Sequence, residues 1–326
     1  MKKKSFVIRL FIILFVFPLS LLAQQSAEKF IVETNYLLYH PEGYENDTTK
    51  QWPLVLFLHG AGETGNDIER VKAHGPSKLI SQGRQFPFIV VSPQAAAYGW
   101  EPKDLIKLYR HIMAGNRVDP DRVYLTGISM GGFGTWAMAM EYPELFAAII
   151  PICGGGDTSK VRKLRHTPVW CFHGDQDNVV PISASEKMVD ALRKYSDDVK
   201  FTIYPGVDHD SWTMTYENDS IYDWLLGHKR FRNEAVVIDK SILQSYCGTY
   251  KMGGEEAVLA LSPEENGIQM KFGQRNGPLL YPLNENTFFI EPYSRIYIST
   301  HKDAGGRVSG FTMDLGDKQL VYTKTE

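Results

Sequence analysis

A serine between two glycines is the first candidate for chemistry in this sequence. Gly127-Ile128-Ser129-Met130-Gly131 follows an apolar run and precedes a Gly-rich segment of helix-forming residues. This order predicts a strand, a tight turn and a helix that present Ser129 as a nucleophile. Gly127 and Gly131 suit positions where a Cβ would collide with a neighbouring strand or helix. An ordinary serine in a Gly-rich turn has the same short pattern. Residues elsewhere in the chain must therefore show whether Ser129 is a nucleophile.

A serine hydroxyl becomes nucleophilic when a histidine accepts its proton and a carboxylate orients that histidine. In chains with this turn, the acid and then the histidine follow the serine. Two predicted strands after Ser129 end in suitable loops: 173–181, with Asp175 and Asp177, and 205–212, with His209. Of nine histidines, His209 alone lies both after the acid loop and at a strand's carboxyl end before the domain closes. We therefore predict His209 as the base, and at this point both aspartates are candidate acids.

The residues 59–65, His-Gly-Ala-Gly-Glu-Thr-Gly, leave another predicted strand. A glycine-rich loop there can place the Ala61 N–H beside the serine, and the N–H of Met130 would supply a second donor for an oxyanion. The loop lacks the Lys-Ser/Thr ending of a phosphate-binding loop. We expect an oxyanion hole at Ala61 and Met130, and a structural, hydrogen-bonded role for His59.

These residues need a scaffold, and the pattern between residues 30 and 229 predicts an α/β fold. Strands that are apolar at consecutive positions alternate with helical segments, which indicates a doubly wound, mostly parallel sheet covered on both faces. Ligands bind such sheets at the carboxyl ends of the strands. In the helix after Ser129 we expect Phe133 and Trp136 in the core. The predicted strands are 31–38, 54–58, 88–91, 123–126, 147–152, 169–172 and 200–204; the predicted helices are 104–114, 132–140, 183–195 and 220–226.

The composition changes after residue 228, where short β-rich runs replace the helical periodicity. We expect about 85 residues of antiparallel sheet, forming a small barrel or a sandwich. The predicted strands are 248–251, 257–261, 268–272, 287–290, 296–300 and 308–314. The expected organisation is a signal peptide at 1–23, a catalytic domain at 24–228, a linker at 229–240 and a C-terminal β domain at 241–326.

The first 23 residues combine four basic side chains with an apolar stretch from Leu10 to Leu22. This pattern predicts a cleaved signal peptide and a secreted or periplasmic protein without a membrane span after cleavage. The remaining chain has 31 basic and 38 acidic side chains, a net charge of −7, which argues against nucleic acid as a partner.

The three cysteines are too few for a disulfide framework, although a single bridge between Cys153 and Cys171 is an open alternative. No metal-ligand spacing is found, so we expect no metal and no cofactor.

Taken together, the motifs resemble secreted α/β-hydrolase serine esterases. This group contains polyhydroxybutyrate-depolymerase-like enzymes, feruloyl and acetyl-xylan esterases, and predicted peptidases related to prolyl oligopeptidases. The resemblance covers about residues 30–227. It is carried by the turn at Ser129, the loop at His59, Pro93-Gln94 followed by Trp100, His173-Gly174-x-x-Asp177-x-x-Val180-Pro181, and His209-x-x-Trp212. Segments 238–250 and 306–311 of the second domain resemble, more weakly, a lipocalin-like module found behind some hydrolases.

The resemblance implies that Ser129 is the nucleophile, Asp177 the acid and His209 the base. We expect Gln94, Trp100 and Trp212 to contact the substrate, with capping of the core as the alternative for Trp100. The implied activity is hydrolysis of a carboxylic ester, with an esterified polysaccharide or oligosaccharide carrying feruloyl or acetyl groups as substrate. A serine peptidase and an inactive hydrolase fold used for binding are the alternatives, and the sequence does not define the oligomeric state.

Overall fold

The computed structural model describes residues 34–261, 266–293, 295–316 and 318–325. The predicted signal peptide and the first residues of the first predicted strand lie outside these ranges. Residues 34–326 belong to one compact unit. No helix among the described residues has the length and apolar character needed to cross a membrane.

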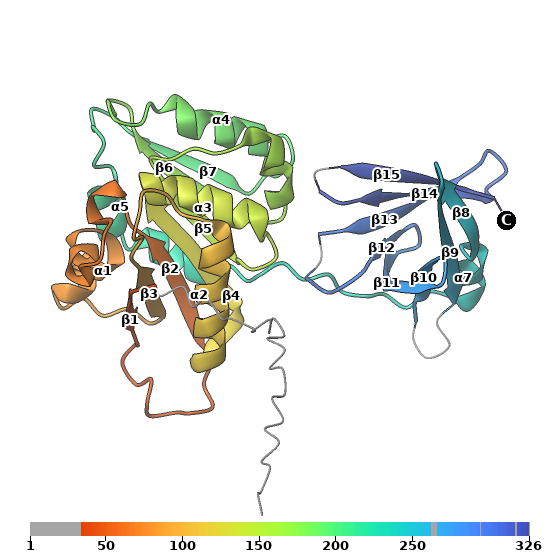
Figure 1. The fold of residues 1–326 in the computed structure, drawn as a ribbon, viewed down its shortest axis with the longest axis horizontal. Helices are drawn as coiled ribbons and strands as arrows, with labels where there is room; N and C mark the ends of the chain where they lie inside the picture. Colours follow the sequence, from red (N-terminus) through yellow and green to blue (C-terminus); the bar gives the residue numbers. More distant parts are fainter. Residues whose placement is uncertain (1–33, 262–265, 294, 317, 326) are drawn as a thin grey trace, which may run out of the picture. The chain divides into compact units, whose positions relative to one another are not determined.

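The first part of this unit is a seven-stranded sheet with the order β1-β3-β2-β4-β5-β6-β7 (Figure 1). Strand β1 pairs antiparallel to β3, and the other neighbours are parallel. This is the mixed sheet of an α/β-hydrolase fold, as predicted. The strands are Tyr36–Tyr39 (β1), Trp52–Leu58 (β2), Ile89–Pro93 (β3), Val118–Ile128 (β4), Ala148–Ile152 (β5), Val169–Gly174 (β6) and Val199–Tyr204 (β7).

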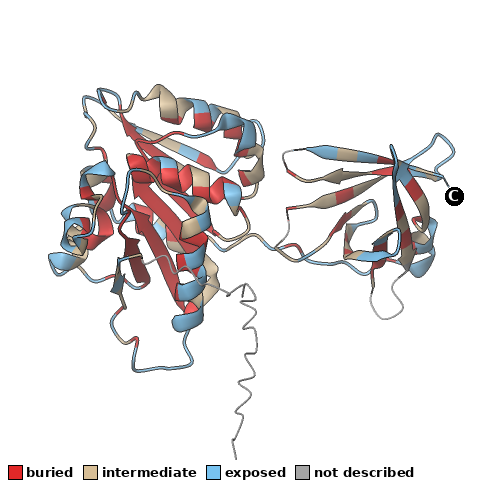
Figure 2. Cartoon of the chain, in the orientation of Figure 1, coloured by how far each residue is buried: buried red, intermediate tan, exposed pale blue. Residues whose placement is uncertain are grey.

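Both faces of the sheet are covered, which explains the unbroken apolar runs in the central strands. All residues of β2, β3 and β5 are buried, and Figure 2 shows the burial along these strands. One hydrophobic core packs the sheet against helices α2, α3 and α4, and a second core packs its other face against α1, α5 and α6. The helices are Gly75–Ser81 (α1), Pro102–Gly115 (α2), Met130–Glu141 (α3), Ser183–Leu192 (α4), Trp212–Glu217 (α5) and Ser220–Leu226 (α6).

The second part is a closed antiparallel barrel with the order β10-β11-β12-β13-β14-β15-β8-β9. The barrel alternative is thus confirmed and the sandwich is wrong. Its core is rich in aromatic rings; those of Phe311 and Tyr322 stack with centroids 4.7 Å apart. The elements are helix Lys240–Ser245 (α7) and strands Gly248–Met252 (β8), Glu255–Leu261 (β9), Ile268–Phe272 (β10), Arg275–Asn284 (β11), Thr287–Phe289 (β12), Tyr297–Lys302 (β13), Val308–Asp314 (β14) and Gln319–Lys324 (β15).

The sequence did not predict β11, β15 or α7. Strand β11 contains Gly277, Pro278 and Pro282, which favour a loop interpretation because proline removes a ladder donor. Helix α7 is only 6 residues long and begins where the Asp239 carboxylate accepts a hydrogen bond from Ser241 N–H. A capped helix this short carries almost no periodic signal.

An ion pair links Arg162, in the 3-10 turn Thr158–Leu164, to Asp314 at the end of β14. Arg162 Nη1 and Nη2 donate to the two Asp314 carboxylate oxygens at 2.7 and 2.6 Å. Burial raises the pKa of Asp314, but the hydrogen bonds from Arg162 and Gly316 outweigh it and hold the pKa below its ordinary value. A carboxylate with a lowered pKa stabilises the folded state only while it is ionised.

We expect the ionised Asp314 to stabilise the folded state fully above pH ~4, the ordinary pKa range of an aspartate in an unfolded chain. This stabilisation should be lost as pH falls through the lower pKa of Asp314 in the folded state. Asp314→Asn should therefore lower the melting temperature at pH 7 relative to the unsubstituted chain. The difference should shrink when both proteins are melted near pH 3. A difference independent of pH would show that the charge of Asp314 is not what stabilises the fold here.

Candidate active site

Ser129 lies at the turn between β4 and α3, at the N-cap of the helix. Its backbone has φ 52° and ψ −117°, a conformation that non-glycine residues rarely adopt. A Cβ added to Gly127 would lie 2.3 Å from the Gly131 carbonyl oxygen, and one added to Gly131 would lie 2.0 Å from the Leu58 carbonyl oxygen. The strained turn and the need for both glycines are confirmed, because backbone atoms occupy the space of a side chain.

Gly131→Ala should consequently destabilise the fold by more than about 2 kcal/mol, since the added methyl group meets backbone and cannot be relieved by a side-chain rotation. We expect a lower melting temperature and a reduced yield of folded protein. Gly62→Ala is a suitable control, because nothing lies within 4 Å of a Cβ at Gly62. Equal stability of the two variants would contradict the close approach of α3 to β2.

Three side chains form a continuous series of hydrogen bonds at the carboxyl ends of the strands. His209 Nε2 lies 2.9 Å from Ser129 Oγ, and His209 Nδ1 lies 2.7 Å from Asp177 Oδ2. The carboxylate can only accept, so Nδ1 carries the hydrogen, and Nε2 of the neutral ring accepts from the serine hydroxyl. This arrangement can transfer the serine proton to the imidazole while the carboxylate faces the resulting cation.

Asp177 is a buried carboxylate whose two oxygens are both hydrogen-bonded. Oδ1 accepts from the N–H groups of Val179 and Val180 at 2.9 and 2.8 Å, while Oδ2 faces His209. Burial raises the pKa of Asp177, yet the hydrogen bonds from His209, Val180 and Val179 outweigh it, so the pKa stays below its ordinary value. Asp177 is therefore ionised at neutral pH, as an anion that orients an imidazole must be.

The other candidate acid, Asp175, has different surroundings. It is exposed, and its Oδ1 accepts a hydrogen bond of 2.7 Å from Gly206 N–H. Asp175 thus links the loop after β6 to the loop after β7. Of the two aspartates, Asp177 is the one that the structure brings into hydrogen-bond contact with His209.

Ala61 and Met130 each open a helical segment, at the 3-10 turn Ala61–Glu63 and at α3. The first N–H of a helix has no acceptor inside that helix, so both donors are free of intrahelical bonds. His59 supports the loop: Nδ1 donates to Gly60 O at 2.6 Å, and Nε2 accepts from Ala95 N–H at 3.0 Å. That is the structural role expected of His59.

Gln94 and Trp100 both hold the loop that carries Ala61. Gln94 is buried, and its Nε2 donates to Glu63 O at 2.8 Å and to Asp67 O at 2.7 Å. Trp100 Nε1 donates to His59 O at 3.1 Å. Contact of either side chain with substrate stays a prediction, and the side-chain N–H groups of both donate to the protein's own backbone.

Trp212 packs directly against the histidine, with its ring nearly perpendicular to that of His209 and the centroids 5.1 Å apart. Its Nε1 donates to His74 Nδ1 at 3.3 Å. Trp212 thereby limits the orientation of His209, and contact with substrate stays a prediction for it too. His74 was missed because it precedes the unpredicted helix α1 and belongs to none of the motifs.

The prediction that Phe133 lies in the core is wrong. Its side chain is 41% exposed, whereas Trp136 is fully buried. Residues 130–132 and 134–136 are all buried, so the helix is enclosed on most sides and periodicity alone does not identify its solvent-facing positions. Phe133 is an exposed aromatic one helical turn from Ser129.

Among the residues that the structure describes, Cys153, Asp177 and His209 form a group of potential metal ligands. Cys153 Sγ, an Asp177 oxygen and a His209 nitrogen lie within 4.8 Å of one another. Burial raises the pKa of the Cys153 thiol strongly, which disfavours the thiolate that metals bind, and the other two groups bind each other. Cys153 and Cys171 are both buried free thiols, so no bridge joins them.

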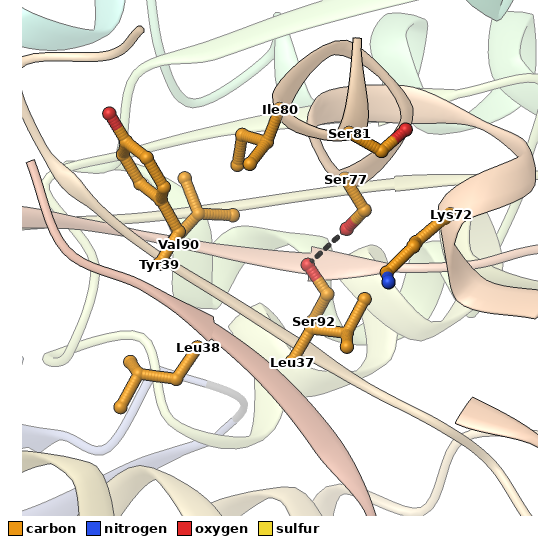
Figure 3. A pocket seen from close by; sticks show the side chains of 9 residues that line it. All are labelled: Leu37, Leu38, Tyr39, Lys72, Ser77, Ile80, Ser81, Val90 and Ser92. Carbon is orange, nitrogen blue, oxygen red and sulfur yellow. Dashed lines mark hydrogen bonds between the residues drawn. The ribbon is translucent and has the colours of Figure 1, made fainter. Parts of the chain in front are cut away.

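A cavity of about 340 Å³ lies beside β1 and α1 (Figure 3). Two buried serines face each other in it, and Ser77 Oγ donates to Ser92 Oγ at 2.7 Å. None of the residues that line it belongs to the series Ser129, His209 and Asp177. Ser77 is thus a buried, hydrogen-bonded serine outside that series.

Comparison with known proteins agrees with this geometry. Residues 101–223 match the family described as "Dienelactone hydrolase family", a range that includes Ser129, Asp177 and His209. These 123 of the chain's 326 residues are thus similar to that family. Three similar proteins are named as a depolymerase, a probable feruloyl esterase and a thermostable esterase.

Poly(3-hydroxyalkanoate) depolymerase C of Paucimonas lemoignei is 36% identical over 121 residues, which are 32% of this chain and 28% of the relative. Probable feruloyl esterase C of Aspergillus terreus is 27% identical over 165 residues, 47% of this chain and 58% of the relative. The solved structure of a thermostable esterase is 36% identical with a TM-score of 0.54, covering 61% of this chain and 60% of the other. The chain thus spans less than two thirds of each of these proteins.

Proposed function

We propose that this chain is a serine carboxylic ester hydrolase that works through an acyl-enzyme. The observation that carries the proposal is the hydrogen-bonded series from Ser129 Oγ to His209 (2.9 Å) and on to Asp177 (2.7 Å), which begins at a strained turn. Such a series is of little use to a binding module, because the backbone strain at Ser129 costs stability.

In the proposed reaction, His209 Nε2 takes the proton of Ser129 as Oγ attacks the ester carbonyl carbon. The N–H groups of Ala61 and Met130 hold the negative oxygen of the tetrahedral intermediate. His209 then returns the proton to the leaving alcohol, which yields the acyl-enzyme. A water molecule, deprotonated by His209, attacks the acyl carbon; the bond to Ser129 Oγ breaks, His209 returns the proton to Oγ, and the acid is released. Asp177 keeps the hydrogen on His209 Nδ1 throughout and stabilises the imidazolium.

For the substrate, we propose an esterified polysaccharide or oligosaccharide with feruloyl or acetyl groups. The support is the relative named as a probable feruloyl esterase, together with the exposed Phe133 one turn from Ser129, which could stack on an aromatic acyl group. Secretion through the leader at 1–23 is part of the same proposal, because a polysaccharide substrate lies outside the cell.

A fluorophosphonate probe tests the reaction class. We expect the full chain to gain the mass of one phosphonyl group, on the peptide that contains Ser129. A panel of methyl ferulate, p-nitrophenyl acetate, acetylated xylan and peptide anilides tests the substrate. Cleavage of the anilides in preference to every ester would favour a peptidase, and a chain that neither reacts with the probe nor hydrolyses any ester would overturn the proposal.

A further inference from the structure

A second histidine lies close to the acid of the active site. His173, at the end of β6, is fully buried, and its Nε2 lies 3.1 Å from Asp177 Oδ2. This is the same oxygen that faces His209 Nδ1 at 2.7 Å. One carboxylate oxygen therefore lies within 3.1 Å of a ring nitrogen of each of two histidines.

The position of the hydrogen on His173 follows from its neighbours. Nε2 also lies 2.9 Å from the carbonyl oxygen of Val180, and a carbonyl, like a carboxylate, can only accept. Nε2 must therefore carry a hydrogen, which it donates to Val180 O, and Asp177 Oδ2 lies 3.1 Å from the same nitrogen. A histidine with the other tautomer would place a bare nitrogen against two acceptors.

The opposite edge of the ring is held as well. His173 Nδ1 lies 2.8 Å from Ser185 Oγ in α4, and that hydroxyl lies 2.8 Å from the carbonyl oxygen of Gly154. Ser185 is fully buried. The imidazole is thus fixed at both nitrogens, between α4 on one side and the loop of Asp177 on the other.

We infer that His173 is a positioning residue, whose Nε2–H holds Val180 O and thereby keeps the loop of Asp177, and its Oδ2, in line with His209 Nδ1. The inference rests on the proposed function, in which Asp177 orients the base. The Val179 and Val180 N–H groups fix Oδ1, and His173 fixes the carbonyl group of the same Val180, whereas His209 must gain and lose a proton in each cycle. A loop held at Val180 keeps the carboxylate in place while the charge of His209 changes.

The inference predicts a specific effect on turnover. In the full chain, His173→Phe should lower kcat by up to about 10²-fold with little change in KM, because a misplaced orienting group weakens the chemical step and not substrate binding. His173→Gln, whose side-chain amide can donate near the position of Nε2, should recover most of that loss. Ser185→Ala should lower kcat by about threefold to tenfold, as expected when one neutral hydrogen bond to the ring is lost.

Ser77→Ala is the matched control for Ser185→Ala, because it also removes a buried hydroxyl that donates one hydrogen bond (Figure 3). It should leave kcat unchanged. Rates are normalised to the fraction of protein that a fluorophosphonate titrates, and circular dichroism checks the fold. If His173→Phe does not fold, the kcat values of Ser185→Ala and His173→Gln test the inference.

Two results would overturn the inference. One is a kcat for Ser185→Ala equal to that of Ser77→Ala; the other is a folded His173→Gln that is no faster than His173→Phe. Both can occur in an enzyme whose unsubstituted chain is active and labelled at Ser129, so they leave the proposed function intact. An unsubstituted chain that is neither labelled nor active would instead remove the proposed function itself, and this inference with it.

Discussion

Replacing Ser129 by alanine should lower kcat by more than about 10⁴-fold and abolish fluorophosphonate labelling, while the fold is retained. The hydroxyl oxygen is the atom that would form the covalent bond. His209 Nε2 lies 2.9 Å from it, and an alanine at this position offers Nε2 no proton to accept. Removing one oxygen leaves almost no cavity, so a loss of this size must come from lost chemistry. Activity assays with p-nitrophenyl acetate and intact-mass analysis after labelling measure both effects.

Ser77→Ala again serves as the control, since it removes a buried hydroxyl outside the active site. It should keep both the activity and the labelling. If Ser129→Ala retained more than about a hundredth of the activity, Ser129 would not be the nucleophile, because a nucleophile carries a far larger factor. Labelling of another serine in the variant would point to the same conclusion.

The central strands and the turn at Ser129 were predictable from the sequence because their physical causes are local. Strand β2 is buried along its whole length, so its apolar run is continuous and easily recognised. Ser129 requires glycines on both sides because backbone atoms of the neighbouring elements fill the space next to them. Each of these constraints restricts the residue type at a single position, so it can be recognised directly in the sequence.

The contacts around the site could not be predicted in the same way, because they depend on which loops meet. Gln94 lies in a motif that suggested substrate binding, yet its amide donates to the carbonyl oxygens of Glu63 and Asp67. His173 is in the same motif as Asp177, but its contact with Ser185 of α4 depends on how that helix packs on β6. Residue types indicate what a side chain can bind, while the fold decides which partner is within reach.

Asp177→Asn should lower kcat by about 10⁴-fold, the size expected when the base is held in the wrong tautomer. The N–H groups of Val179 and Val180 need an acceptor, so the amide oxygen of the asparagine should occupy the position of Oδ1. Its NH₂ group then faces His209 Nδ1 and donates to it. A neutral imidazole that accepts at Nδ1 carries its hydrogen on Nε2, where it cannot take the proton of Ser129.

Asp175→Asn is the matched control for this substitution, because it makes the same chemical change two residues away. Asp175 is exposed, and an asparagine oxygen can also accept from Gly206 N–H, so kcat should change less than about threefold. Steady-state kinetics of both variants on the same ester compare them directly. An inactive Asp175→Asn beside an active Asp177→Asn would assign the acid to Asp175 and would mean that the 2.7 Å contact of Asp177 with His209 has no part in catalysis.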